Sequence, residues 1–324
     1  IFPVDFWPCS ALAYRRLKPT VIVLTEGELW PEHLGQARTR GLPTLLINAR
    51  LSDRSFARHQ RFNWASRGLL ADFTWIGAGS EEDARRLMSL GAEPANVDVT
   101  GNLKFDVASD GPLSPGERLV LRHSLGFDGR ERSLVLLGSS TWEGEEILLL
   151  DVVQALRAEG LDARLLLAPR HAERRDSIVR LLAASGLAFH QRSTQGQNAP
   201  GGTIVHFADT TGELRQLTRA ADLAFSGKSL DPHDGGQTPV ECAAAGVPVV
   251  YGPRMTNFKA ICQGLEQAGA ARKAADADGV RQALMALARD AADRARMGQA
   301  GQEWHAANRG ASRRTAQAIL AQLR

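Results

Sequence analysis

Several turns in the second half of the sequence carry glycine, hydroxyl or arginine side chains directly after a run typical of a buried strand. In open parallel sheets, ligands bind at the carboxyl ends of the strands. Backbone N–H groups and hydroxyls there suit an anion, and arginine forms forked hydrogen bonds to a phosphate or carboxylate. One such turn is equally well explained as an ordinary helix cap or a solvated arginine, but several in one domain favour a nucleotide pocket. The turns are Gly138-Ser139-Ser140-Thr141, Pro169-Arg170-His171, Asp209-Thr210-Thr211-Gly212-Glu213, and the stretch from Gly227-Lys228-Ser229 to Glu241.

The last of these stretches contains Gly235-Gly236-Gln237-Thr238-Pro239-Val240-Glu241. The pattern predicts a helix with Thr238 as its N-cap and Pro239 at its first position. The helix dipole and free N–H groups would form an anion site, which the paired Gly235 and Gly236 let a phosphate approach closely. Glu241 would then hold ribose hydroxyls. A glycine-rich loop followed by an ordinary acidic first turn explains the same residues about as well.

The first half of the sequence offers two further candidates at strand ends. Glu26 and Glu28 follow the predicted strand at 21–24, where carboxylates could orient a polar acceptor or support proton transfer. Both could equally cap the next helix. Lys104 follows the strand at 97–99 and could meet negative charge developing on a leaving phosphate; a solvated lysine is the simpler interpretation.

A basic segment with aromatic residues follows the second strand. Its arginines recur at helical spacing, and such a face can sit on an anionic membrane or hold lipid phosphates. A solvated amphipathic helix is at least as good an interpretation. The residues are Arg50, Arg54, Arg58 and Arg61, with Phe56, Phe62 and Trp64 interleaved.

The elements that position these residues alternate between strand and helix, which predicts an α/β protein with parallel sheets. We expect two doubly wound Rossmann-like domains facing a cleft, joined by a linker near 107–116. The domains are residues 1–110, which lack their opening βα units, and residues 117–310, which carry the candidate nucleotide pocket. A helix at 311–324 packs back on the first domain. Further strands are predicted at 44–47, 73–78, 133–137, 163–167, 203–206, 223–225 and 247–251, and helices at 29–40, 81–90, 143–158, 172–185, 213–220 and 239–245.

Composition narrows the functional classes. The 324 residues carry a net charge of only +3, which argues against nucleic acid as a partner. The three cysteines, Cys9, Cys242 and Cys262, form no C-x-x-C pair, so we expect neither a disulfide framework nor a zinc site. No apolar run reaches the roughly 18 residues that span a membrane.

The motifs, taken in order, resemble the Kdo (3-deoxy-D-manno-octulosonic acid) transferases over nearly the whole chain. No single motif is decisive, but the ordered set is specific. It comprises Glu26-Gly27-Glu28-Leu29-Trp30-Pro31, Asn48-Ala49-Arg50-Leu51-Ser52, Gly101-Asn102-Leu103-Lys104-Phe105-Asp106, Gly138-Ser139-Ser140-Thr141, Glu143-Gly144-Glu145-Glu146, Pro169-Arg170-His171, Gly212-Glu213-Leu214, Gly235-Gly236, Pro239, Glu241, Gly252-Pro253 and Asn257-Phe258.

This resemblance implies a GT-B fold and inverting transfer of Kdo from CMP-Kdo to a lipid A precursor, without a metal or other cofactor. The resemblance also implies that the protein acts at the cytoplasmic face of the bacterial inner membrane. Glu26 and Lys104 match the family's charge-stabilising pair around the sugar. The CMP-contacting turns match Pro169-Arg170, Thr211-Gly212-Glu213 and Thr238-Pro239-Val240-Glu241.

The sequence departs from the family pattern at a few positions. Gln237-Thr238 replaces the usual His-Asn, Lys228 replaces Gly, and Thr211 replaces Met; Lys228 could add a phosphate contact. The family's Gly-Glu loop with the catalytic base is not in the sequence, so we expect this chain alone to be inactive. The alternatives are a GT-B enzyme that uses a UDP-sugar, either a transferase or a 2-epimerase, and a non-catalytic nucleotide-binding protein.

Overall fold

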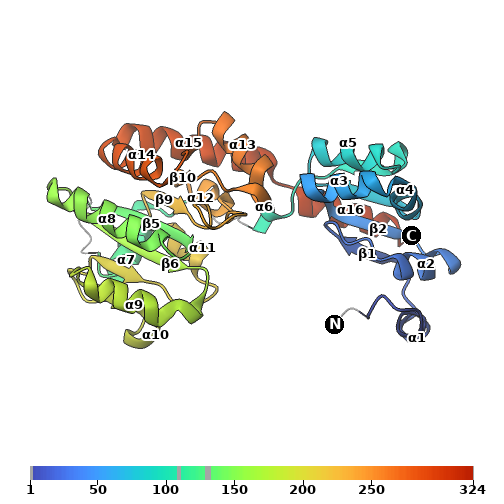
Figure 1. The fold of residues 1–324 in the computed structure, drawn as a ribbon, viewed down its shortest axis with the longest axis horizontal. Helices are drawn as coiled ribbons and strands as arrows, with labels where there is room; N and C mark the ends of the chain where they lie inside the picture. The colour runs from blue at the N-terminus through green and yellow to red at the C-terminus, as the bar shows by residue number, and fades with distance from the viewer. Residues whose placement is uncertain (1–2, 108–110, 128–132, 324) are drawn as a thin grey trace. The chain divides into compact units, whose positions relative to one another are not determined.

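The computed structural model describes residues 3–107, 111–127 and 133–323, which form two compact units. Unit 1 comprises Ile1–Val107 and Asn308–Arg324, and unit 2 comprises Ala108–Ala307 (Figure 1). The predicted linker at 107–116 lies partly outside the described residues. The chain returns to unit 1 for its last helix, so this unit is built from two distant segments.

Unit 1 contains a four-stranded parallel sheet in the order β1-β2-β3-β4. Each strand predicted in this part of the chain overlaps an observed one, whereas helix α1 was not predicted. The elements are α1 (Trp7–Leu17), β1 (Ile22–Thr25), α2 (Pro31–Thr39), β2 (Thr44–Ala49), α3 (Asp53–Arg61), α4 (Asn63–Leu70), β3 (Trp75–Ala78), α5 (Glu81–Ser89), the 3-10 turn η1 (Pro94–Asn96), β4 (Val97–Val99), α6 (Lys104–Val107) and α16 (Ala311–Ala321).

The core of unit 1 follows from the alternation of side chains along its strands. Leu24, Leu46 and Ile76 are at most 3% exposed and belong to one apolar cluster. The helices complete this cluster with leucine and alanine at helical spacing, such as Leu34 and Ala37 of α2. One face of the sheet is thereby covered, which fixes the register of the strands and the direction in which their ends point.

Helix α16 is fastened to the loop after β4. Asp106 Oδ1 accepts a hydrogen bond from the Gly310 N–H at 2.7 Å, and Oδ2 accepts one from the Ser312 N–H at 2.5 Å. Arg314 Nε donates to the Thr100 carbonyl at 2.9 Å. Burial acts to raise the pKa of Asp106, but the hydrogen bonds from Ser312 and Gly310 outweigh it and lower that pKa. The Asp106 side chain, which follows β4 in the chain, therefore caps the first turn of α16.

Unit 2 contains a seven-stranded sheet in the order β11-β10-β9-β5-β6-β8-β7, with parallel pairing throughout. The edge strands β7 and β11 were not predicted; both are three residues long. The elements are α7 (Pro115–Ser124), β5 (Leu134–Thr141), α8 (Glu145–Ala158), β6 (Ala163–Pro169), η2 (Ala172–Arg174), α9 (Arg175–Ala184), β7 (Phe189–Gln191), α10 (Arg192–Gln195), β8 (Val205–Phe207), α11 (Leu214–Thr218), β9 (Leu223–Ser226), α12 (Val240–Ala245), β10 (Val249–Tyr251), η3 (Thr256–Phe258), α13 (Lys259–Gln267), β11 (Ala271–Lys273), α14 (Ala277–Arg289) and α15 (Ala291–Asn308).

The central strands of unit 2 are buried on both faces, as expected for a parallel sheet. Leu134 and Leu136 of β5 belong to the apolar cluster that also contains residues of α8, α9 and α14. Val135 and Leu137, which point to the opposite face, are also fully buried at 0% exposure. This continuous apolar run explains why the sequence signal for β5 was strong.

Candidate functional site

The strand order of unit 2 reverses at β5. From β5 the chain forms β6, then the edge strand β7, then β8 between those two, and it then crosses to the other side of β5 to form β9. Such a reversal leaves a crevice at the carboxyl ends of the two diverging strands, where open α/β sheets bind ligands. The predicted turn at 138–141 is part of β5, and Gly227, which follows β9, lies against this end of the strand, since a Cβ there would stand 2.4 Å from the Ser140 carbonyl oxygen. Only glycine allows this approach.

Glu145 joins the two turns at this reversal. Its carboxylate is 2% exposed and accepts hydrogen bonds from the backbone N–H groups of Trp142 at 2.8 Å, Lys228 at 3.0 Å and Ser229 at 3.0 Å. Burial raises the pKa of Glu145, although these three N–H donors act in the opposite direction. The carboxylate therefore serves the architecture of the site, which the sequence motif alone did not indicate.

Aromatic and basic side chains gather around Trp142, directly after β5. Lys228 Nζ lies 4.6 Å from the centre of the indole ring, a cation–π distance. The ring of His171 meets the indole edge-on at 4.8 Å, and the ring of His233 lies 5.1 Å from it. His233 Nε2 lies 2.9 Å from the Glu143 carbonyl oxygen, which ties the glycine-rich loop to the start of α8.

The loop after β6 brings Arg170 to the same edge of the sheet. The Arg170 N–H donates to the Thr141 carbonyl at 3.1 Å, while its side chain is exposed. Four residues later, Arg174 forms two hydrogen bonds, of 2.8 and 3.0 Å, to the carboxylate of Glu146, which is only 1% exposed. This buried ion pair anchors the loop to α8 and leaves the guanidinium of Arg170 available to an anion.

The turn after β8 is held by two carboxylates. Asp209 is 3% exposed and accepts hydrogen bonds from Arg175 Nε at 2.5 Å and from the Ser193 N–H at 2.9 Å. Glu213 accepts two hydrogen bonds from Arg192, of 3.0 and 2.6 Å, and this pairing lowers the pKa of Glu213. Because the Glu213 side chain is engaged in this pair, the exposed Thr211 and the backbone are what the turn offers a ligand.

The glycine-rich stretch differs from the prediction. Helix α12 begins at Val240 with Pro239 as its N-cap, so Thr238 is not the N-cap; its Oγ1 accepts from the Val240 N–H at 3.4 Å. Pro239 therefore lies outside the helix, with Glu241 in the first turn.

The paired glycines also serve packing. Both have a positive φ, 112° at Gly235 and 70° at Gly236, and the Gly236 N–H donates to the Lys228 carbonyl at 3.0 Å. A Cβ on Gly236 would stand 2.4 Å from Met255 Sδ. Close contact with protein atoms thus explains these glycines without a ligand.

In unit 1 the buried Asn48 draws the segment that carries Lys104 toward Glu26. Glu26 follows β1 and Lys104 follows β4, and these strands are separated by β2 and β3. The Leu103 N–H donates to Asn48 Oδ1 at 3.2 Å, and Asn48 is 5% exposed near the end of β2. The loop that carries Lys104 is therefore drawn back across β3 to the strand beside β1.

Glu26 and Glu28 do not cap α2. The N-cap of that helix is Trp30, which makes no side-chain cap bond, and the helix begins at Pro31, two residues after the predicted start. Glu28 Oε2 accepts from Trp30 Nε1 at 3.4 Å. The Glu26 carboxylate is 54% exposed and lies 3.9 Å from Arg50 Nη1, a weak contact that leaves it open to a substrate.

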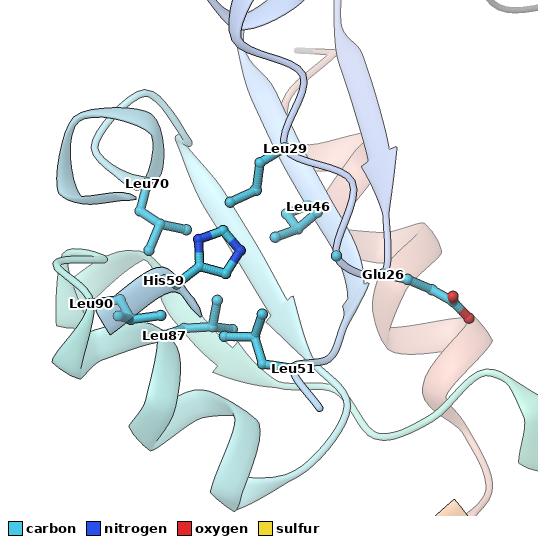
Figure 2. Close-up of a pocket in the computed structure, with 9 residues that line it drawn as sticks. Glu26, Leu29, Leu46, Leu51, His59, Leu70, Leu87 and Leu90 are labelled. Carbon is cyan, nitrogen blue, oxygen red and sulfur yellow. The ribbon is translucent and has the colours of Figure 1, made fainter. Parts of the chain in front are cut away.

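Behind this strand end lies a small apolar cavity of about 10 Å³, at the lower limit of room for one water molecule. Figure 2 shows the His59 ring among leucines such as Leu46 and Leu87, with the Glu26 carboxylate directed away from them. Burial lowers the pKa of His59. The cavity belongs to the core and leaves Glu26 on the outside.

The basic segment forms a helix only in part. Ser52 caps α3 by accepting the Ser55 N–H at 3.2 Å, so Arg50 precedes the helix and does not share its face with the later arginines. Phe56 packs against the core of unit 1 and is not on the outer surface. Arg54 and Arg58 are exposed.

The surface near these arginines is also aromatic, because Phe62 is 52% exposed and Trp64 is 82% exposed. Over the described parts of the chain, no helix is long and apolar enough to cross a membrane. Within the same parts, no group of three histidine, cysteine or acidic side chains is placed to hold a metal ion.

Two units built on parallel sheets, one with a strand reversal of the kind at which open α/β sheets bind ligands, are typical of a GT-B fold. The fold of Anabaena Alr3699/HepE in complex with UDP is similar over 97% of this chain and 82% of that one, with a TM-score of 0.61 at 16% identity. Likeness at that level of identity shows the fold alone.

The particular family follows from closer matches. A family model described as 3-deoxy-D-manno-octulosonic-acid transferase (kdotransferase) matches residues 1–107. The 3-deoxy-D-manno-octulosonic acid transferase of Bordetella pertussis is 37% identical over 98% of this chain and 72% of its own length. This chain belongs to that family of glycosyltransferases. The C-terminal CMP-Kdo binding domain of WaaA from Acinetobacter baumannii is 27% identical over 59% of this chain and 96% of that domain, with a TM-score of 0.52.

Sequence reasoning missed some residues that shape the site. Trp142 comes directly after the predicted Gly138-Ser139-Ser140-Thr141 turn, and this position at a strand end could have identified it as a site residue. Asn48 was noted only as part of a motif. Nothing in the spacing indicated that Glu145 would bridge to Lys228, because the two residues are 83 positions apart.

Proposed function

We propose that this protein transfers Kdo from CMP-Kdo to a lipid A precursor, with inversion at the anomeric carbon, as a step of lipopolysaccharide synthesis. The similarity to the Bordetella pertussis enzyme along almost the whole chain carries the proposal. The likeness of unit 2 to a CMP-Kdo binding domain supports the same donor. A nucleotide-sugar donor also suits the crevice at the strand reversal of unit 2.

The donor would lie at the carboxyl ends of β5, β6 and β9. Arg170 is exposed there and suits bidentate contact with the phosphate of CMP. Lys228 adds a second positive charge beside the end of β5, which carries Ser139 and Ser140. Thr211, Gly212 and the start of α12, with Thr238, Val240 and Glu241, would contact the nucleoside. Donors fixed before the reaction stabilise the charge that develops as CMP leaves.

The chemistry would involve the strand ends of unit 1. Lys104 would neutralise negative charge on the sugar carboxylate or the departing phosphate, and Glu26 would balance charge around the transferring sugar. A general base takes the proton of the acceptor hydroxyl as its oxygen forms the new bond to the anomeric carbon; the bond from that carbon to the CMP oxygen breaks, and its electron pair leaves with CMP. We propose that no metal or other cofactor takes part.

The acceptor side would meet the cytoplasmic face of the inner membrane. Exposed Arg54 and Arg58 lie close in sequence to exposed Phe62 and Trp64, and basic and aromatic side chains together favour an anionic lipid surface. Glu28 and Arg50 would orient the lipid A precursor at the strand end.

The direct test is transfer by the full-length enzyme with CMP-Kdo generated in the assay and a lipid A precursor as acceptor. We expect Kdo-modified lipid, no product from UDP-sugars, and at least a hundredfold loss of kcat for Arg170→Ala or Lys104→Ala, the loss typical of removing one charge-stabilising donor. Turnover of a UDP-sugar, or full activity of both variants, would contradict the proposal.

The membrane contact is tested separately by sedimentation with vesicles. The Arg54→Glu/Arg58→Glu variant should bind anionic vesicles at least tenfold more weakly than the wild type, at about 1 kcal/mol per basic residue lost. The variant Arg281→Glu/Arg313→Glu, at two other exposed arginines, serves as the charge-matched control. Unchanged binding would remove this part of the proposal and leave the donor reaction standing.

A further inference from the structure

We infer that Trp142 is a positioning residue that sets the ammonium group of Lys228 for the donor phosphate. This inference rests on the proposed CMP donor and adds a residue to its site. It comes from the contacts among Trp142, Lys228 and the two histidines at the strand reversal of unit 2.

The backbone of Lys228 is held in a costly conformation. Its φ is +58°, a left-handed value that is uncommon for a residue other than glycine. Strain of this kind persists where surrounding contacts over-determine it, and it concentrates at ligand sites. The Lys228 N–H donates to buried Glu145, and the Lys228 carbonyl accepts the Gly236 N–H at 3.0 Å. Both backbone groups of the lysine are therefore fixed.

The side chain of Lys228 has a ring as its partner and no counter-ion. Nζ lies 4.6 Å from the centre of the Trp142 ring, and among the described residues no carboxylate lies within 4.0 Å of it. A cation held by the face of a ring keeps its charge and its hydrogen-bond donors for another group. A phosphate oxygen is the chemistry that fits an ammonium at such a strand end.

Trp142 itself is fixed by its neighbours. His171 and His233 contact its ring, and Glu145 accepts a hydrogen bond from its backbone N–H. Its indole N–H is shielded from solvent and has no acceptor within the described residues, so no hydrogen bond of the indole competes with its ring contacts. The indole thus defines where the ammonium group rests before the donor arrives, which reduces the side-chain entropy lost on binding.

The test compares CMP with cytidine by titration calorimetry, because the two ligands differ by the phosphate. Lys228→Met should weaken CMP binding about tenfold, as for loss of one charge-assisted hydrogen bond, and leave cytidine binding unchanged. Trp142→Leu should weaken CMP binding by about three- to fivefold, as for loss of a cation–π contact, and Trp142→Phe should restore most of it. In the Lys228→Met background, Trp142→Leu should have no further effect.

The outcomes separate the inference from the proposed function. If the wild type binds neither ligand, the proposed CMP donor fails. Suppose that CMP binds and that Lys228→Met weakens its binding. The positioning role is then wrong if Trp142→Leu weakens CMP and cytidine binding equally. It is also wrong if Trp142→Leu adds its full effect in the Lys228→Met background. If Trp142→Leu does not fold, Trp142→Met removes the ring and fills more of its volume, and with Lys228→Met it completes the same double-mutant cycle.

Discussion

At the scale of single residues, most acidic side chains at the strand ends of unit 2 serve the structure and not the ligand. Glu145, Glu146, Asp209 and Glu213 each accept two or more hydrogen bonds from nearby backbone or arginine groups. The sequence places these carboxylates correctly after the strands, but spacing does not reveal their partners. Their common effect is to fix the turns, and within the described residues neither Arg170 nor Lys228 has an ion-pair partner.

Replacing Glu145 tests this structural role. Glu145→Gln substitutes an amide N–H₂ for one acceptor and leaves a buried backbone N–H without its partner. We expect a loss of about 1–3 kcal/mol in the free energy of unfolding, measured by urea denaturation, together with weaker CMP binding. Glu143→Gln, at an exposed neighbouring position, is the control and should change neither. Equal stability of the two variants would contradict the role assigned to Glu145.

A buried histidine predicts how stability depends on pH. Burial, and then the charges of His190 and Arg192, lower the pKa of His206 to about 4, whereas its ordinary value is 6.5. Between these values the unfolded chain binds a proton that the folded protein does not, so stability falls as pH decreases from 6.5 toward 4. The contribution of His206 is about 2 kcal/mol between pH 6.5 and 5.

Urea denaturation of the wild type and of His206→Leu at a series of pH values measures this term. The variant should lose less stability than the wild type on acidification. Parallel curves for the two proteins between pH 6.5 and 5 would show that His206 does not titrate as described.

At the scale of elements, alternation predicted the central strands because they carry long apolar runs. The short edge strands β7 and β11 were missed because three residues give no periodic signal. The start of α12 was misplaced because Thr238-Pro239 has the composition of a helix start, while the loop contacts of Gly235 and Gly236 delay it. Arg50 was assigned to a helix because its spacing to Arg54 is helical, although Ser52 begins that helix later.

The attachment of α16 is a prediction at this scale. Asp106→Asn keeps one acceptor oxygen but cannot accept both N–H groups of the first turn of α16. We expect a loss of about 1 kcal/mol in the stability of unit 1, as for the loss of a helix cap. Because the pKa of Asp106 is lower in the folded protein than in the unfolded chain, this contribution to stability is present at neutral pH. It disappears as the pH falls through the lowered pKa.

Denaturation at pH 7 and at pH 3 checks the effect of Asp106→Asn, with Asp72→Asn as a control in an exposed ion pair with Arg38. A difference of the same size at both pH values would show that the charge of Asp106 is not what fastens the helix.

At the scale of the whole molecule, the two units have separate apolar cores, and their division follows from contacts within each. The sequence predicted the two Rossmann-like domains, and it proposed residues for a donor site, but the contacts that hold those residues depend on pairs far apart in the chain. Trp142 with Lys228 and Asn48 with Leu103 are such pairs. Long-range pairing of this kind leaves no local pattern in a sequence.

The central claim is that unit 2 binds CMP, and thermal unfolding with CMP, with UDP and without nucleotide tests it most directly. At about 100 times its dissociation constant, a ligand of the folded state stabilises by about 2.7 kcal/mol, which is visible as a higher Tm. We predict that CMP raises the Tm, that UDP does not, and that Arg170→Ala abolishes the effect of CMP. A rise with UDP alone, or no rise with CMP, would contradict the account.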